Sequence, residues 1–317
     1  MKFFIHFFST LVILFFVWST LIIFQSGNPT LSSQWVYDAY QKKERIANSI
    51  NGKKIVVVAG SNVLFGVDSK LLSKAFKLPV VNYGVNAGIE LPYILYISKK
   101  IIKKGDIVLL PLEYPMYSYK GETSQQMIDY VLSREPSFFW KLSLKEQFYM
   151  VWHIGFERIY HGYFYQGGKP ITEGLYGAHH IDQYGDQNET EIGYRTEWMQ
   201  KDILNNYAIN AERYGEEFNE NSLGWQYLQF FIDWCHVKGA TTIFMPSTLM
   251  QHPNYLKNKK ERWFYENIAN EIKKEGWRFI GKPYDYMYDK EDYFNTNFHL
   301  IDRARKKRTQ QMILDLQ

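Results

Sequence analysis

The sequence predicts an α/β fold, a doubly wound and mostly parallel sheet with helices on both sides. Two short apolar runs, Lys54–Ala59 and Asp106–Leu110, are rich in β-branched residues and leucine, which is typical of buried parallel strands. A third such run, Thr241–Met245, lies near the C-terminal end. Strands that alternate with helical segments favour parallel pairing. A chain of 317 residues has room for one large domain that carries an insertion.

The remaining elements of this domain follow from local pattern. Residues 33–50 are polar and amphipathic, and Asn51-Gly52 ends them as a helix. A second short strand is expected at residues 80–82 and a last one at residues 277–280. Further helices are expected at residues 69–76, 90–103, 222–238, 261–274 and 301–316.

Composition excludes several classes of protein. Lys and Arg number 37 against 33 Asp and Glu, and hydrophobic residues make up 46%, which excludes an intrinsically disordered chain. The net charge of +4 is weak for a nucleic-acid binder, whose basic residues gather on one face. The single cysteine, Cys235, allows no internal disulfide and no multi-cysteine zinc site. We expect no cofactor and no metal.

The N-terminus is expected to anchor the chain in a membrane. Residues 3–24 contain no Asp, Glu, Lys or Arg, and as a helix they span about 33 Å, enough for a bilayer core of roughly 30 Å. A cleaved signal peptide is the alternative, but its apolar run is normally about 7–15 residues long. Lys2 precedes the span, so the positive-inside rule places the rest of the chain outside the inner membrane, in the periplasm of a bacterium.

The middle of the chain breaks the alternation of strands and helices. Residues 121–221 are dense in Tyr, Trp, His and Gly, and aromatic side chains there either stack on sugar rings or pack the segment onto the sheet. The sequence thus divides into an anchor, a connector helix, an α/β domain and an aromatic-rich insertion or cap. Their ranges are 1–25, 26–52, 53–120 with 222–317, and 121–221.

Three segments are expected to meet at the carboxyl edge of the sheet, where ligands bind in such folds. They are residues 59–66 after the first strand, residues 82–88 after the second, and residues 295–300 before the last helix. A hydroxyl at a strand-to-helix turn lies near the positive end of the helix, and glycine turns can aim N–H groups at an oxyanion. A histidine nearby, His299, can act as a general base.

On these segments the chain resembles the SGNH/GDSL hydrolase-like superfamily. It is similar to membrane-anchored relatives that modify bacterial surface polysaccharides, such as alginate and peptidoglycan O-acetylation proteins and the teichoic-acid D-alanyl transfer protein. The motifs are GSNVLFG at residues 60–66, NYGVNAG at 82–88 and FNTNFHL at 294–300. The resemblance implies a flavodoxin-like SGNH sheet, acyl-ester chemistry on a surface glycan, and a membrane-bound acyltransferase as a possible partner.

The sequence departs from the family pattern at the residues that react. The nucleophile position falls on Asn62 rather than serine, and the aspartate of the family's triad is Asn295 here. A carboxamide is no acyl nucleophile, and an amide cannot stabilise an imidazolium as a carboxylate does. The family's third block, Gly-x-Asn-Asp, is replaced by Pro111-Leu112-Glu113-Tyr114.

Two readings of the site stay open, with a structural scaffold as a third. In the first, Ser61 is the nucleophile of an acyltransferase or esterase, His299 is its base, and Asp292 or Glu113 orients the imidazole. Asn62, Gly84 and Asn86 then supply or assist the oxyanion site. In the second, the chain is a non-catalytic partner that binds glycan. In either case the site is lined by Glu113, Asn295 and Asn297.

Overall fold

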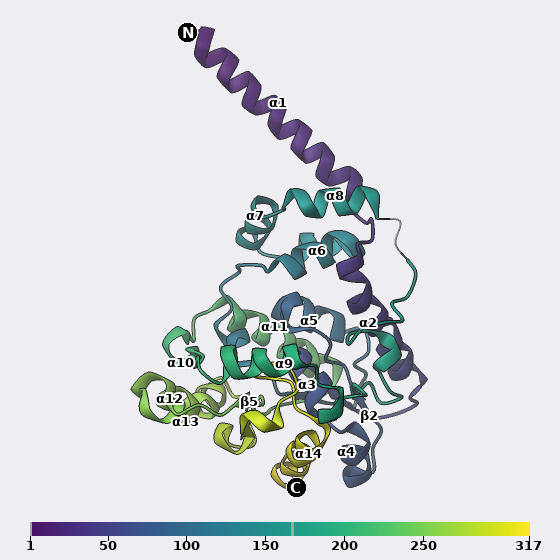
Figure 1. The fold of residues 1–317 in the computed structure, drawn as a ribbon, viewed down its shortest axis with the longest axis vertical. Coiled ribbons are helices and arrows are strands. Elements are labelled where there is room, and N and C mark those ends of the chain that lie inside the picture. The colour runs from purple at the N-terminus through teal and green to yellow at the C-terminus, as the bar shows by residue number, and fades with distance from the viewer. Residues whose placement is uncertain (1, 166–167) are drawn as a thin grey trace. The chain divides into compact units, whose positions relative to one another are not determined.

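The structure is a computed structural model that describes residues 2–165 and 168–317 (Figure 1). The chain divides into two compact units. Unit 1 comprises Met1–Tyr37 and Gly121–Pro170, and unit 2 comprises Asp38–Lys120 and Ile171–Gln317. Residues 121–221, expected as one insertion, are therefore shared between the units. Helix α2 (Leu31–Ser49) contains the boundary at Tyr37.

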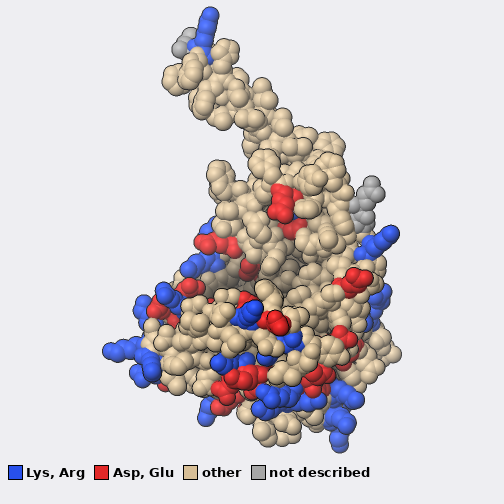
Figure 2. Space-filling view, in the orientation of Figure 1, with Lys and Arg blue, Asp and Glu red and all other residues tan. Residues whose placement is uncertain are grey.

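Unit 1 is helical. Helix α1 (Lys2–Gln25) is long and apolar enough to cross a membrane, although a signal sequence meets the same criteria. None of its most apolar window is buried, and its surface carries a basic side chain only near the N-terminal tip (Figure 2). The other long helices of the unit are α6 (Gln125–Arg134), α7 (Leu144–Trp152) and α8 (Phe156–Phe164). The 3-10 helix η3 (Pro136–Lys141) separates α6 from α7.

Unit 2 contains a four-stranded sheet in which all strands are parallel. The order is β2 (Val80–Asn82), β1 (Ile55–Val57), β3 (Ile107–Leu110) and β4 (Thr241–Phe244). The α/β class and the parallel sheet are thus confirmed. In the register, Val56 of β1 lies opposite Val81 of β2 and Val108 of β3. These three valines are fully buried, as expected for strands that read as continuous apolar runs.

The helices of unit 2 form two groups. Helix α5 (Glu90–Ser98) packs against α11 (Leu223–Lys238), while α14 (Asp302–Leu316) packs against α3 (Ser61–Gly66) and α4 (Ser69–Phe76). The crossovers β1–β2 and β2–β3 run in opposite directions along the sheet. Because such crossovers are right-handed, α4 and α5 lie on opposite faces.

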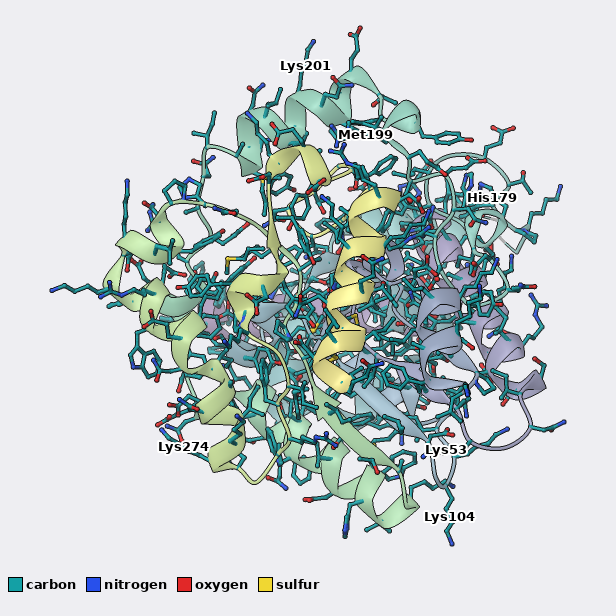
Figure 3. The ribbon with its side chains drawn as sticks, turned by 90° about the horizontal axis from the view of Figure 1, so that it is seen from below. Lys53, Lys104, His179, Met199, Lys201 and Lys274 are labelled. Atoms are coloured by element: carbon teal, nitrogen blue, oxygen red, sulfur yellow. The ribbon has the colours of Figure 1, made fainter. Side chains whose placement is uncertain are left out.

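The carboxyl ends of the strands point toward one end of unit 2. Lys53 and Lys104, which precede β1 and β3, lie at the opposite end from Met199 and Lys201 of α9 (Glu197–Asp202) (Figure 3). Two-residue strands form a second parallel sheet, β5 (Leu249–Met250) with β6 (Met287–Tyr288). The other α-helices of this unit are α10 (Tyr214–Glu217), α12 (Asn254–Lys257) and α13 (Lys259–Lys274).

Two expected elements are shorter in the structure. The helix expected at 90–103 ends at Ser98, whose hydroxyl bonds back to the carbonyl of Ile94, and the chain continues in turns. The strand expected at 277–280 is reduced to one bridge between Phe244 and Phe279. Two backbone hydrogen bonds flank Phe244 there, and β4 ends at that residue, so the ladder cannot extend.

Candidate functional site

The first two expected segments pack directly on each other at the carboxyl end of the sheet. After β1, Gly60 caps α3, and after β2 the chain passes through Gly84. A Cβ on Gly84 would overlap the side chain of Val63 and the carbonyl oxygen of Gly60. A Cβ on Gly60 would lie 2.6 Å from the Cα of Ala87. Glycine at positions 60 and 84 is therefore required by close approach of the two loops.

A buried carboxylate occupies the N–H groups of the first turn. Gly60 N–H donates to Glu113 Oε2 and Asn62 N–H donates to Glu113 Oε1, both at 3.0 Å. Glu113 follows β3 and is 2% exposed. These N–H groups lie where an oxyanion would bind at a strand-to-helix turn. The protein's own anion already neutralises that position.

Asn62 is held on both sides of its amide. Its Nδ2 donates to the carbonyl of Pro111 at 3.0 Å, and its Oδ1 accepts from Arg308 Nη2 at 2.9 Å. Arg308 Nη1 donates to the Asn62 carbonyl oxygen at 2.9 Å. Arg308 comes from α14 and is fully buried, and a Cβ on Gly66 would overlap its guanidinium. Asn62 therefore ties α3 to α14 and to the segment after β3.

Two buried charges of opposite sign enclose this turn. Burial lowers the pKa of the Arg308 guanidinium. Three tyrosines act in the opposite direction, and the Glu113 carboxylate adds a smaller contribution of the same sign. Arginine stays protonated even when buried. Because each charge would be costly to bury alone, the turn and its two flanking side chains form one compensated unit.

The third segment carries His299 in a closed loop. Phe294 N–H donates to the His299 carbonyl oxygen at 2.6 Å. His299 Nδ1 lies 2.7 Å from Asn295 Oδ1, and Asn295 Nδ2 donates to the hydroxyl of Tyr176 at 2.9 Å. Because Asn295 uses its NH₂ group on Tyr176, its oxygen accepts from Nδ1–H of the imidazole. Nε2 is then the unprotonated nitrogen, and it has no hydrogen-bond partner among the described residues.

The imidazole lies against α3, the helix that follows the first turn. Its ring stacks on Phe65 with centroids 4.1 Å apart and planes at 7°. His299 is 5% exposed, and burial lowers its pKa to about 3. An imidazole with such a pKa accepts a proton poorly at neutral pH, and its Nδ1 faces an amide rather than a carboxylate.

The structure does not join the expected catalytic residues into a hydrogen-bonded relay. Ser61 is half-buried at the start of α3, and no hydrogen bond links it to His299 in the described part of the chain. Asp292 is 3.2 Å from Arg303 Nε and also pairs with Lys307 at 3.7 Å. The partner of the imidazole is therefore Asn295, whereas the carboxylates of Asp292 and Glu113 face other groups.

The other expected oxyanion donors are engaged as well. Gly84 N–H donates to Asn82 Oδ1 at 3.1 Å, and the Gly84 carbonyl accepts from the buried Lys43 ammonium. Asn86 uses its side-chain oxygen to accept from Gly88 N–H at 2.8 Å, which caps the short helix after it. The loop at residues 82–88 thus contains two turns, each closed by an asparagine side chain.

Unit 2 has a polar cavity, and one of the residues that line it is hydrogen-bonded to the FNTNFHL segment. Asn297 Nδ2 donates to Glu212 Oε1 at 2.9 Å, and Glu212 lines a cavity of about 540 Å³. Burial raises the pKa of Glu212. The other lining residues are Ile209, Asn210, Ala211, Arg213, Glu216, Asn254, Asn258 and Glu261. Amides, carboxylates and a guanidinium in one cavity suit a ligand rich in hydroxyl groups.

Sequence reasoning missed Arg308, Tyr176 and Glu212 at this site. Arg308 stands in a basic run that reads as a solvated helix face, yet it is the one most deeply buried. Tyr176 and Glu212 lie in residues 121–221, and no local pattern relates them to Asn295 or Asn297. No family model matches the sequence, and no curated protein or solved structure matches it.

Proposed function

We propose that the chain is a membrane-anchored, extracytoplasmic SGNH-like protein of bacterial exopolysaccharide or surface-glycan assembly, acting as a non-catalytic partner. Its role is to bind glycan or to serve a membrane-bound acyltransferase as a scaffold. The observation that carries the non-catalytic assignment is Glu113, whose carboxylate accepts from Gly60 N–H and Asn62 N–H. A site filled by the protein's own carboxylate repels an oxyanion instead of stabilising it.

Two further observations support the same assignment. The position that the family resemblance gives to the nucleophile holds Asn62, whose amide nitrogen donates to Pro111 and whose amide oxygen accepts from Arg308. His299 has a pKa lowered to about 3, and it has no carboxylate partner among the described residues. A general base works best with a pKa near the operating pH.

The polar cavity beside Glu212 supports the binding role. Its side chains offer several donors and acceptors within one volume of about 540 Å³, large enough for one or two sugar rings. Helix α1 supports the anchor, because it is long and apolar enough to cross a bilayer. The periplasmic orientation rests on Lys2 alone.

An acyltransferase or esterase acting through Ser61 is the second candidate. One observation favours it: the Nδ1–Asn295 hydrogen bond leaves Nε2 of His299 free to accept a proton. The Ser61 hydroxyl has no hydrogen-bond partner among the described residues, so it is available to Nε2 after a rotation or a loop shift.

Turnover measurements separate the two candidates. The full chain in detergent is assayed with p-nitrophenyl acetate and an O-acetylated polysaccharide, beside Ser61→Ala and His299→Ala. We expect equal background rates in all three proteins, together with measurable binding of the polysaccharide that Glu212→Ala weakens. Turnover that disappears in both Ser61→Ala and His299→Ala would establish the enzyme instead.

A further inference from the structure

Two consecutive helices of unit 1 carry the same exposed apolar pattern. On α7 the exposed positions are Leu144, Phe148, Val151 and Trp152, and on α8 they are Phe156, Tyr160, Tyr163 and Phe164. Both sets have the spacing i, i+4, i+7 and i+8, which places each on a single stripe of its helix. Leu144 is 83% exposed, Trp152 75% and Phe156 80%. These side chains face away from the core of the unit.

The stripe on α8 is one of three sectors. Arg158, Ile159 and Gly162 are buried against the rest of the unit. Glu157 and His161 form an exposed pair, 3.6 Å apart, along the edge of the stripe. A helix with a core sector, an apolar sector and a polar edge is shaped for a boundary between apolar and aqueous surroundings.

The stripe begins at the end of the candidate membrane span. The ring centroids of Trp18 and Phe156 are 4.9 Å apart, and the Tyr163 hydroxyl donates to the Leu21 carbonyl oxygen at 3.2 Å. Figure 1 shows α8 lying across the C-terminal end of α1. Trp18 and Leu21 are about 9 Å and about 4.5 Å from Phe24 along the helix axis. Interfacial helices bury their apolar face about 5–10 Å deep.

Hydrogen bonds and an ion pair fix α8 to the exit of α1. Gly27 N–H donates to the carbonyl of Leu132 in α6 at 2.6 Å. Arg158 of α8 pairs with Asp129 of α6 at 2.8 Å and reaches the Asn28 carbonyl at 3.4 Å. The chain leaving the span, α6 and α8 are thus one bonded cluster. The depth of the stripe in the membrane follows from the position of α1.

We propose that α7 and α8 lie in the interfacial layer of the membrane that α1 crosses, with their two apolar stripes inserted among the lipids. The partner is a lipid bilayer surface, because both stripes adjoin the apolar surface of the span. The α8 stripe contacts it at Trp18, and Val151 of α7 lines a groove together with Ile22 and Ile23 of α1. Few charged side chains interrupt the surface over α1 and α8 (Figure 2). Trp140, which is 76% exposed just before α7, adds the residue type enriched at membrane interfaces. The inference rests on the anchor of the proposed function and is independent of the site in unit 2.

Spin-label depth measurements on the full chain test this placement. The buried Cys235 is first replaced by alanine, and single labels are attached at Leu144→Cys, Trp152→Cys, Phe156→Cys and Phe164→Cys after reconstitution into phosphatidylethanolamine/phosphatidylglycerol nanodiscs. The collision rate of each label is measured separately with oxygen, which concentrates in lipid, and with a nickel chelate, which stays in water. We expect the ratio of oxygen to nickel accessibility to be several-fold higher at the four stripe positions than at Glu157→Cys.

A label at Val12→Cys in the middle of α1 serves as the internal standard. Stripe labels as accessible to nickel as Glu157→Cys, with Val12→Cys in lipid, would place α7 and α8 in water and overturn the proposal. Stripe labels shielded from both reagents would show that protein, such as a second copy, covers the face, and would overturn it too. Nickel access at Val12→Cys would show that α1 does not cross the bilayer, and would overturn both the anchor and the proposal. None of these results bears on glycan binding.

Discussion

At the scale of single residues, the turn after β1 is held by two side chains that come from distant parts of the chain. Glu113 closes its N–H groups, while Arg308 binds the carbonyl and the side-chain oxygen of Asn62. Each of these side chains forms a hydrogen bond with a buried backbone or amide group that would be costly to leave unpaired. The position at which the resemblance places a nucleophile, Asn62, is here bonded to Pro111 and Arg308 and has a structural role.

Replacing Glu113 by glutamine should destabilise unit 2. Glutamine keeps the shape but loses the charge that compensates Arg308, and it turns an NH₂ group toward one of the two N–H donors. We expect a loss of about 3 kcal/mol in the free energy of unfolding. Urea denaturation followed by circular dichroism measures it. The exposed Glu275→Gln is the matched control and should change stability by less than about 0.5 kcal/mol. Equal stability of the two variants would contradict the role of Glu113.

The buried imidazole should make stability depend on pH. His299 has a pKa of about 3 in the folded chain and about 6.5 when unfolded. Its contribution to stability is present above about pH 6.5 and is lost as pH falls toward 3, because only the unfolded state then takes up the proton. The slope reaches about 1.4 kcal/mol per pH unit.

Denaturation at several pH values compares wild type with His299→Gln, and the exposed His236→Gln serves as control. The difference between wild type and His299→Gln should shrink as pH falls from 6.5 to 4. A difference that stays constant with pH, or that His236→Gln reproduces, would mean that His299 titrates normally in the folded state.

At the scale of elements, α3 and α14 depend on a glycine between them. A Cβ on Gly66 would overlap Arg308 Nη1, so Gly66→Ala should displace the guanidinium from Asn62. We expect a destabilisation of about 1–3 kcal/mol from overpacking. Gly193→Ala is the control, because a Cβ there meets no atom within 4 Å. Thermal melting of both variants provides the measurement, and equal melting temperatures would show that Arg308 has room to move.

In unit 1, a buried ion pair contributes to the attachment of α8. Arg158 and Asp129 are 6% and 15% exposed at the side chain. Arg158→Met should remove the pair and leave Asp129 only hydroxyl donors among the described residues, those of Thr30, Ser32 and Ser133. We expect a loss of about 3 kcal/mol in local stability and faster proteolysis within residues 153–165. Arg195→Met in unit 2 is the control, and unchanged cleavage of α8 in Arg158→Met would contradict the attachment.

Elements of the fold could be predicted where the signal is local. The four strands were predicted within two residues at each end, because a buried parallel strand is a continuous apolar run. The helix expected at residues 90–103 ends at Ser98, after which the backbone forms i→i−3 turns. The strand expected at residues 277–280 is one bridge, because β4 ends at Phe244. The stripes on α7 and α8 were not predicted, because residues 121–221 were expected only as an aromatic-rich insertion or cap.

At the scale of the whole molecule, the site could be predicted in part. The segments at residues 60–66 and 82–88 are in contact, and His299 lies against Phe65 of the first segment. Which atoms they bond could not be predicted, because Glu113, Tyr176 and Arg308 reach the site from distant positions in the chain. The boundary between the two units at Pro170 could not be predicted, because the amino-acid composition does not change at that residue.

Our proposal requires that the turn at Gly60–Asn62 is structural and carries out no acyl chemistry. A fluorophosphonate, which phosphonylates serine hydroxyls that a histidine base activates, tests this claim most directly. The full chain in detergent is incubated with the reagent, and peptides that contain Ser61 are examined by mass spectrometry. The account predicts no adduct at Ser61, in wild type or in His299→Ala. Phosphonylated Ser61 in wild type that is absent from His299→Ala would contradict it.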